Sequence, residues 1–233
     1  MPWSIFLLEK NVIMFSSSTT DQATLAAKQW TGTVSSYQGG DYLLWVDANL
    51  GALKTDAVLE RALTYTLSPS GTTYVGTATM RYTHGGGRDW KTSRYLTCIR
   101  LYLPPGTKFI RMKGIEKNAL GIPTTTPDHG VELGREWFGG FASMDPGTVD
   151  EVSFTYELAP SLVTMMKNGV YYALFQKQLG TKGHALTLDL DFGRKVVSAE
   201  PGETTQEYGD THYRAVSNLR TDRYVEVKIA TNK

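Results

Sequence analysis

The chain has 233 residues with a formal net charge of +1, and 41% of its residues are hydrophobic and 20% are charged. This composition is typical of a globular protein and argues against intrinsic disorder. The balanced charge excludes the basic surface that a nucleic-acid partner needs, and no apolar stretch approaches the roughly 20 residues of a membrane span, so we expect neither nucleic-acid binding nor membrane insertion.

The first 36 residues predict a small strand-helix unit. Residues 11–15, NVIMF, are apolar enough for a short buried strand. Residues 18–30 begin with Thr and Asp as candidate N-caps, and Gly32 follows their end, which indicates a helix. The SSYQGG stretch at 35–40 closes the unit, which we expect to pack on a main domain formed by residues 37–233.

From residue 41 onward the pattern changes to a succession of strands. In residues 58–67, Leu59, Arg61 and Leu63 alternate with more polar neighbours, and similar alternation recurs at 74–82, 152–158 and 186–192. Period-two alternation is typical of antiparallel sheets with one buried face. The sequence therefore predicts a mainly β fold, an antiparallel β-sandwich of immunoglobulin-like or larger size. We expect about 9 to 12 strands, one sizeable helix near residues 20–30, and a candidate subdivision near 160–168.

The His-Gly-Gly-Gly run that starts at His84 is similar to the oxyanion loop of lipases and esterases. Such enzymes carry their nucleophile in a G-x-S-x-G turn, and no serine of this chain has glycine at both positions. We therefore interpret residues 84–91 as an exposed hairpin loop between two strands. His184 and His212 also stand near glycines, so we expect them in loops as well.

Two groups of polar residues are candidates for metal ligation. His129, Glu132 and Glu136 are close in sequence, but on a single strand the two glutamates would share one face and His129 the other. Asp189 and Asp191 could contribute to a calcium site, yet a solvent-facing strand surface explains them more simply. We expect no metal and no cofactor.

Cys98 is the single cysteine, which excludes an internal disulfide and a CxxC metal site. We expect it to be buried as a small apolar residue that reacts slowly with thiol reagents.

Aromatic residues offer the remaining candidate binding groups. Trp90, in a glycine-rich loop, and Trp137 are the candidate ligand-binding residues. We expect Trp90 to pack back onto the sheet, with an exposed platform for glycans as the alternative.

Five stretches of the sequence together resemble a known family. They are EKNVIMFSSSTTDQATLAAKQWTG, GGDYLLWVDANLGALKTDAVLERALTY, RDWKTSRYLTCIRLYLPPGTKFI, FGGFASMDPGTVDEVSFTYEL and YYALFQKQLGTKGHALTLDL. This order resembles the C-terminal β-rich region of uncharacterised bacterial envelope proteins that contain "domain of unknown function 4012". The resemblance implies a location outside the membrane, at the cell surface, and assigns no catalytic residues.

Three functional hypotheses follow. The first is a non-catalytic extracytoplasmic β-sandwich module of a bacterial cell-surface protein, with a structural or interaction role and another envelope protein as partner. The alternative is a module that binds cell-wall glycans. The third is an enzyme that acts on envelope polymers through carboxylates such as Glu132 and Glu136.

Overall fold

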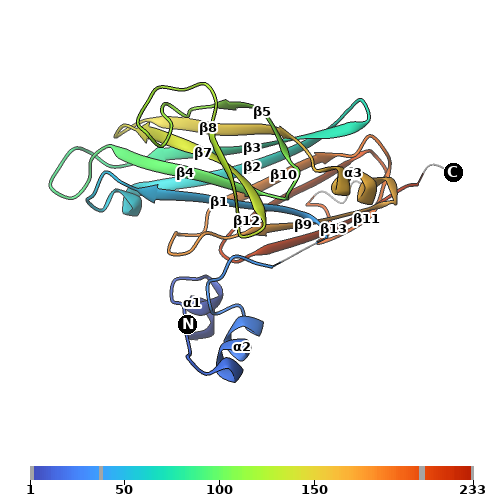
Figure 1. Ribbon diagram of the computed structural model, residues 1–233, viewed down its shortest axis with the longest axis horizontal. Coiled ribbons are helices and arrows are strands. Elements are labelled where there is room, and N and C mark those ends of the chain that lie inside the picture. The colour runs from blue at the N-terminus through green and yellow to red at the C-terminus, as the bar shows by residue number, and fades with distance from the viewer. Residues whose placement is uncertain (1–2, 37–38, 205–207, 232–233) are drawn as a thin grey trace.

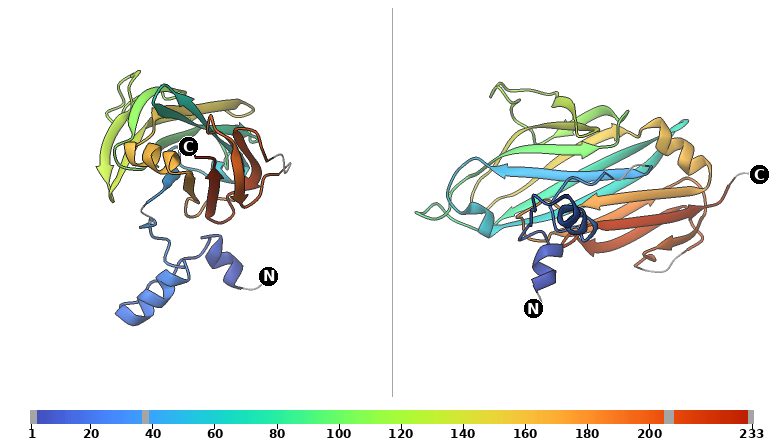
Figure 2. Two further views of the ribbon diagram at one scale, coloured as in Figure 1. Left: turned by 90° about the vertical axis from the view of Figure 1, so that its right-hand side faces the viewer. Right: turned by 60° about the horizontal axis from the view of Figure 1, so that its bottom comes forward.

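The computed structural model describes residues 3–36, 39–204 and 208–231, and these form two β-sheets packed face to face (Figures 1 and 2). The seven-stranded sheet has the order β11-β13-β9-β1-β4-β7-β6, and the six-stranded sheet has the order β12-β10-β2-β3-β8-β5. The predicted β-sandwich is confirmed. The 13 strands among the described residues slightly exceed the expected number. In chain order the elements are α1 (Trp3–Leu8), α2 (Thr19–Ala27), β1 (Asp41–Asn49), the 3-10 helix η1 (Thr55–Val58), β2 (Leu59–Ser70), β3 (Thr73–His84), β4 (Tyr95–Leu103), β5 (Lys108–Lys113), β6 (Asp128–Glu132), β7 (Arg135–Met144), β8 (Val149–Glu157), α3 (Pro160–Lys167), β9 (Val170–Gln176), β10 (Ala185–Asp191), β11 (Val196–Glu200), β12 (His212–Asn218) and β13 (Arg223–Ile229).

The core between the sheets contains several buried tyrosine side chains. Tyr65 and Tyr171 are fully buried there, and a buried hydroxyl needs a hydrogen-bond partner. Both hydroxyls donate to the carboxylate of Asp41 at the start of β1, at 2.8 and 2.6 Å. Burial raises the pKa of Asp41 above its usual range. Polar groups are therefore part of the sandwich interior as well as its surface.

The expectation of purely antiparallel sheets is wrong for two strand pairs. β1 runs parallel to β9, and β2 runs parallel to β10, so both sheets are mixed. Period-two alternation reports which face of a strand is buried, and it carries no information about the direction of its neighbour.

The helix α3, which the sequence pattern did not predict, occupies residues 160–167. It leads from β8 in the six-stranded sheet to β9 in the seven-stranded sheet. Both sheets contain strands from before and after this helix.

The N-terminal unit differs from the expected strand-helix arrangement. Residues 11–15 form no strand, and the unit contains α1 and α2 instead. Of this apolar run, Phe15 is 83% exposed. The Met14 N–H donates to the carbonyl oxygen of Trp30, a residue that follows α2 and belongs to no strand. The predicted helix is confirmed over α2, with Ser18 as its N-cap.

The N-terminal unit lies below the sandwich in Figure 1 and reaches it through a few polar contacts. Lys10 forms a buried ion pair with Asp222 at 2.6 Å, and Glu9 pairs with Arg220 at 2.8 Å. Within the part of the chain that the structure describes, no helix is long and apolar enough to cross a membrane.

Several connections gather at one end of the sandwich, on the left of Figure 1, which we call the loop end. It comprises residues 50–58, 85–94, 145–148, 177–184 and 219–222. Hydrogen bonds join these connections to one another. The Lys54 N–H donates to the Lys91 carbonyl at 2.9 Å, and the Leu219 N–H donates to the His184 carbonyl at 2.7 Å. Lys182 donates to the Ala57 carbonyl at 2.9 Å, and Arg88 donates to Asp145 at 2.6 Å. The loops therefore form one continuous, mutually supported surface.

The interpretation of residues 84–91 as a hairpin loop is wrong. β3 and β4 belong to different sheets, so the segment crosses from one sheet to the other. His84 is only 1% exposed. Its Nε2 donates to the Ser93 carbonyl at 2.8 Å, because its Nδ1 accepts from the Gly86 N–H at 3.2 Å. His84 is thus a structural anchor for the crossing segment.

Candidate functional site at the loop end

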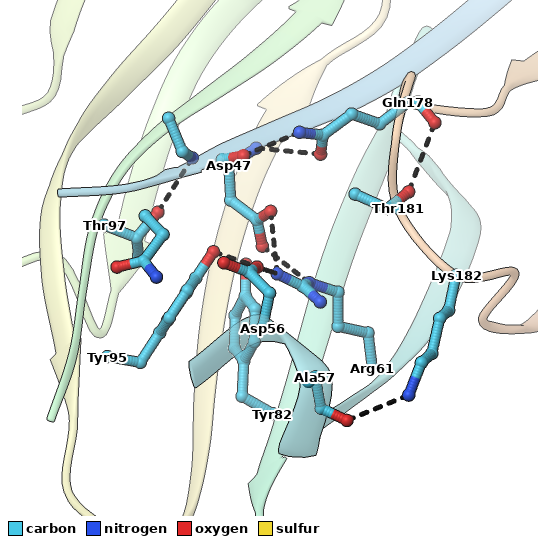
Figure 3. A network of polar contacts seen from close by, with 12 residues as sticks. Asp47, Asp56, Ala57, Arg61, Tyr82, Tyr95, Thr97, Gln178, Thr181 and Lys182 are labelled. Carbon is cyan, nitrogen blue, oxygen red and sulfur yellow. Dashed lines mark hydrogen bonds and ion pairs between the residues drawn. The ribbon is translucent and has the colours of Figure 1, made fainter. Parts of the chain in front are cut away.

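A buried ion pair lies where the hydrophobic core meets the loop end (Figure 3). Asp47 is the last fully buried inward-facing residue of β1, and Arg61 faces it from β2 in the opposite sheet. The guanidinium binds the carboxylate through two hydrogen bonds, Nε to Oδ2 at 2.9 Å and Nη2 to Oδ1 at 3.1 Å. The side chains are 5% and 1% exposed, so the pair links the two sheets out of contact with bulk water.

Arg61 has further partners in the same cluster. Its Nη2 also donates to Asp56 and to the hydroxyl of Tyr95, both at 2.9 Å, and its guanidinium lies 5.8 Å from the ring centre of Tyr82. Burial acts to lower the pKa of Arg61, but the charge and hydrogen bonds of Asp47, together with Tyr95 and Tyr82, outweigh burial and raise it. Two carboxylates thus compensate the guanidinium charge, and the cluster is suited to positioning the surrounding loops.

Hydrogen bonds connect residues 177–184 to the cluster around Asp47 and Arg61. The side chain of Gln178 accepts from the Asp47 N–H at 3.0 Å and donates to the Asp47 carbonyl at 2.6 Å. Lys177 is 1% exposed and donates to the carbonyls of Gln178 and Thr181 at 3.0 and 2.7 Å. Burial lowers the pKa of Lys177 to about 8, and the nearby charge of Lys10 acts in the same direction.

A pocket of about 370 Å³ opens beside the ion pair, between residues 57–61 and 182–185. His184 lines it and is 7% exposed. Burial lowers the pKa of His184 to about 4, and the charge of Arg61 acts in the same direction. Neither ring nitrogen has a hydrogen-bond partner of good geometry among the described residues. His184 lies in a loop, as expected, but its side chain is buried because it continues the inward alternation of β10.

Trp90 lies on a neighbouring loop and is 86% exposed, so the expectation that it packs onto the sheet is wrong. Hydrogen bonds nevertheless stabilise the loop that carries Trp90. The carboxylate of Asp89 accepts from the backbone N–H groups of Lys91 and Thr92 at 2.8 and 2.6 Å, and these bonds lower the pKa of Asp89. Trp90 is thus displayed to solvent from a fixed turn.

Trp137, the second candidate ligand-binding residue, lies elsewhere. It is half-buried on the outer face of the seven-stranded sheet, with the Arg100 guanidinium 4.3 Å from its ring centre. Its partner on β4 is Tyr102, whereas β4 leaves the loop end at Tyr95. That separation is roughly 23 Å at the rise of a strand. The structure does not bring Trp90 and Trp137 together.

The glutamates of the enzymatic hypothesis point to opposite sides of the sheet. His129 binds Glu136 at 2.9 Å, while Glu132 accepts from Arg100 and Tyr102 at 2.9 and 3.0 Å. The expectation that Glu132 and Glu136 share a face is wrong, because the chain turns between them and places them on β6 and β7.

The described residues contain no group of three or more His, Cys, Asp or Glu side chains that could hold a metal ion. Asp189 and Asp191 lie on the outer face of β10, as predicted. His212 of the neighbouring strand binds Asp189 at 2.7 Å and lies 3.8 Å from Asp191.

Cys98 is half-buried on the outer face of β4, so the expectation of full burial is wrong. The inward positions of that strand are those of Tyr95, Thr97 and Ile99. Burial still raises the pKa of the Cys98 thiol.

The chain matches no family model and no curated protein. Among solved structures it is similar to a Legionella pneumophila protein described as a candidate nutrient-binding protein, with 5% identity, a TM-score of 0.46, and coverage of 81% of this chain and 70% of that chain. It is also similar to an M1 zinc metallopeptidase of Deinococcus radiodurans, with 12% identity and a TM-score of 0.31 over 73% of this chain. The chain spans 42% of the metallopeptidase. The TM-scores are low, so neither likeness supports a function for this chain.

Proposed function

We propose that the chain is a non-catalytic β-sandwich module of a bacterial cell-surface protein, located outside the membrane, that binds a partner through its loop end. The observation that carries this proposal is the exposed indole of Trp90 on a loop fixed by Asp89. Tryptophan is enriched among the residues that dominate binding energy, and a fixed loop loses little entropy when a partner binds. The extracytoplasmic location is supported by the resemblance of the five sequence stretches given above.

The charged groups of the loop end support a non-catalytic role. Asp47 and Arg61 bind each other, and Lys177 binds two carbonyl groups. Each group stabilises the arrangement of the loops, and none is paired with a nucleophile. The module therefore holds a preformed surface for another envelope component.

A glycan of the cell wall is the second candidate partner. An exposed indole can stack on the apolar face of a sugar ring, because its flat surface is apolar while its N–H remains able to form hydrogen bonds. The high exposure of Trp90 favours this partner over a purely structural role.

Co-sedimentation of the purified chain with isolated bacterial cell walls tests the binding role. We expect Trp90→Ala to raise the dissociation constant about tenfold, the effect of losing about 1.4 kcal/mol of binding energy, with an unchanged melting temperature. Leu120→Ala is the matched control, because Leu120 is 82% exposed on a different connection. Equal binding of the wild type and Trp90→Ala would contradict the proposal.

The location is tested on intact cells that produce the protein. A membrane-impermeant amine reagent should label the chain before lysis. Labelling that requires lysis would place the chain inside the cell and overturn that part of the proposal.

A further inference from the structure

The pocket beside the Asp47–Arg61 pair contains a buried histidine that the fold itself does not use. His184 is 7% exposed, and both ring nitrogens lack a partner of good geometry within the described chain. A buried polar group normally forms hydrogen bonds, since leaving one without a partner costs about 1–3 kcal/mol. Unlike His84, whose two ring nitrogens hold the β3–β4 crossing in place, His184 has two covered nitrogens without such partners, so a ligand that displaces the covering atoms gains two hydrogen-bonding groups.

The protonation state of His184 limits what this ligand can be. Its pKa is lowered to about 4, chiefly by burial, so the ring is neutral near pH 7. A neutral imidazole donates one hydrogen bond and accepts another. A hydroxyl group matches both functions, because it can also donate and accept. A carboxylate ion only accepts, and a phosphate ion carries negative charge.

The charges around the pocket also argue against an anionic ligand. Asp47 and Asp56 compensate the guanidinium of Arg61. The remaining charged residues that line the pocket are Glu60 and Lys182, one of each sign. Together with Arg61 and its two carboxylates, these groups carry one net negative charge, so the pocket does not attract an anion.

The walls and size of the pocket suit a small amphipathic molecule. Ala57, Val58 and Leu59 supply apolar surface on one side, and His184 supplies the hydrogen-bonding groups on the other. The volume of about 370 Å³ lies at the lower end of the range for small-molecule sites. The loop that carries Trp90 is hydrogen-bonded to the same wall, since the Gly85 N–H donates to the Val58 carbonyl at 3.0 Å.

From these observations we infer that the pocket binds a single sugar unit of a carbohydrate, with the His184 imidazole hydrogen-bonded to a sugar hydroxyl. This inference rests on the proposed binding role of the loop end and assigns it a site and a ligand class. Trp90 then contacts a neighbouring part of the same glycan.

The test is a titration of the full chain with N-acetylglucosamine, glucose and inorganic phosphate, followed through the imidazole C–H resonances of His184 by NMR. We expect a sugar to shift these resonances and phosphate to leave them unchanged. Ala57→Trp should weaken sugar binding at least about tenfold, because it places an indole in the pocket from an exposed position without altering the core. Ala23→Trp is the matched control, since Ala23 is exposed on α2 and does not line this pocket. His184→Gln, which keeps a donor and an acceptor, should bind more weakly than the wild type but more strongly than His184→Ala.

The other outcomes separate this inference from the proposed function. If cell walls bind and Trp90→Ala abolishes their binding while Ala57→Trp has no effect, the binding function stands and the pocket assignment is overturned. A shift produced by phosphate instead of sugar would overturn the ligand class. If neither cell walls nor sugars bind, both proposals fail.

Discussion

Replacing Asp47 by alanine should lower the free energy of unfolding by about 3 kcal/mol. The change leaves the guanidinium of Arg61 in a site where its side chain is only 5% exposed, without the two hydrogen bonds at 2.9 and 3.1 Å that now bind it. Removing one partner of a buried ion pair typically costs about 3–5 kcal/mol. Arg61 keeps its bonds to Asp56 and Tyr95, so we place the cost at the lower end of that range.

Urea denaturation and differential scanning calorimetry measure this effect. For a chain of this size, each kcal/mol shifts the melting temperature by about 2–4 °C, so Asp47→Ala should melt roughly 6–12 °C below the wild type. Glu157→Ala is a suitable control, because it breaks a solvent-exposed pair with Lys108 and should cost less than about 1 kcal/mol.

A double variant distinguishes the loss of pairing from the loss of packing. In Asp47→Leu combined with Arg61→Met, both charges are removed together, and the stability should recover to nearly that of the wild type. A melting temperature of Asp47→Ala within about 2 °C of the wild type would refute the reasoning, as would a double variant whose cost equals the sum of the two single changes.

Four further predictions concern other parts of the structure. His84→Ala should cost about 2–3 kcal/mol in urea denaturation, because it removes two buried hydrogen bonds; a cost below about 0.5 kcal/mol would restore the exposed-loop interpretation. Cys98 should react with a thiol reagent more slowly in the folded than in the unfolded chain at pH 7, because its raised pKa leaves little thiolate in the folded state. The rate for the folded chain should rise towards pH 9. Equal rates for the folded and unfolded chains at pH 7 would contradict this prediction. Gly114→Ala should destabilise the fold by more than about 2 kcal/mol in urea denaturation, because its φ is +80° and a methyl group would overlap a carbonyl oxygen of β8. Gly71→Ala should cost about 1 kcal/mol in the same assay, because its φ is +59° but the space around it is open. Burial favours the neutral form of His184 in the folded state, where its pKa is about 4, against about 6.5 in the unfolded chain. The stability of the protein should therefore be unaffected by this residue above about pH 6.5 and should fall as the pH decreases towards about 4. A pH series of denaturation curves should show this loss in the wild type and not in His184→Asn.

Much of the sandwich could be predicted from side-chain alternation. In β2 the inward face predicted from Leu59, Arg61 and Leu63 is the face that the structure packs between the sheets, although Arg61 is half-buried as a whole residue. The alternation of apolar and polar residues indicates which side chains of one strand are buried. It therefore could not identify the parallel neighbours of β1 and β2, because those depend on strands more than 100 residues away.

The candidate site was missed for a related reason. His184 stands two residues before Leu186, in step with the inward positions of β10, and His84 stands two residues after Tyr82 in β3. Extending each alternation by one step would have placed both histidines inside the protein, but the adjacent glycines favoured loops. The partner of Arg61 could not be read in the same way, since Asp47 faces it from the other sheet.

The two buried carboxylates of β1 have a mechanical consequence. Asp41 accepts a hydrogen bond from Tyr65, and Asp47 binds Arg61, so both ends of β1 are connected to β2 in the opposite sheet. The two connections are six residues apart, or roughly 20 Å along the strand. Sliding one sheet over the other would break both of them, and rotating the sheets about either connection would break the other. The sandwich should therefore resist shear along its strands, and a load applied at the loop end should be transmitted through β1 and β2 to the far end of the domain.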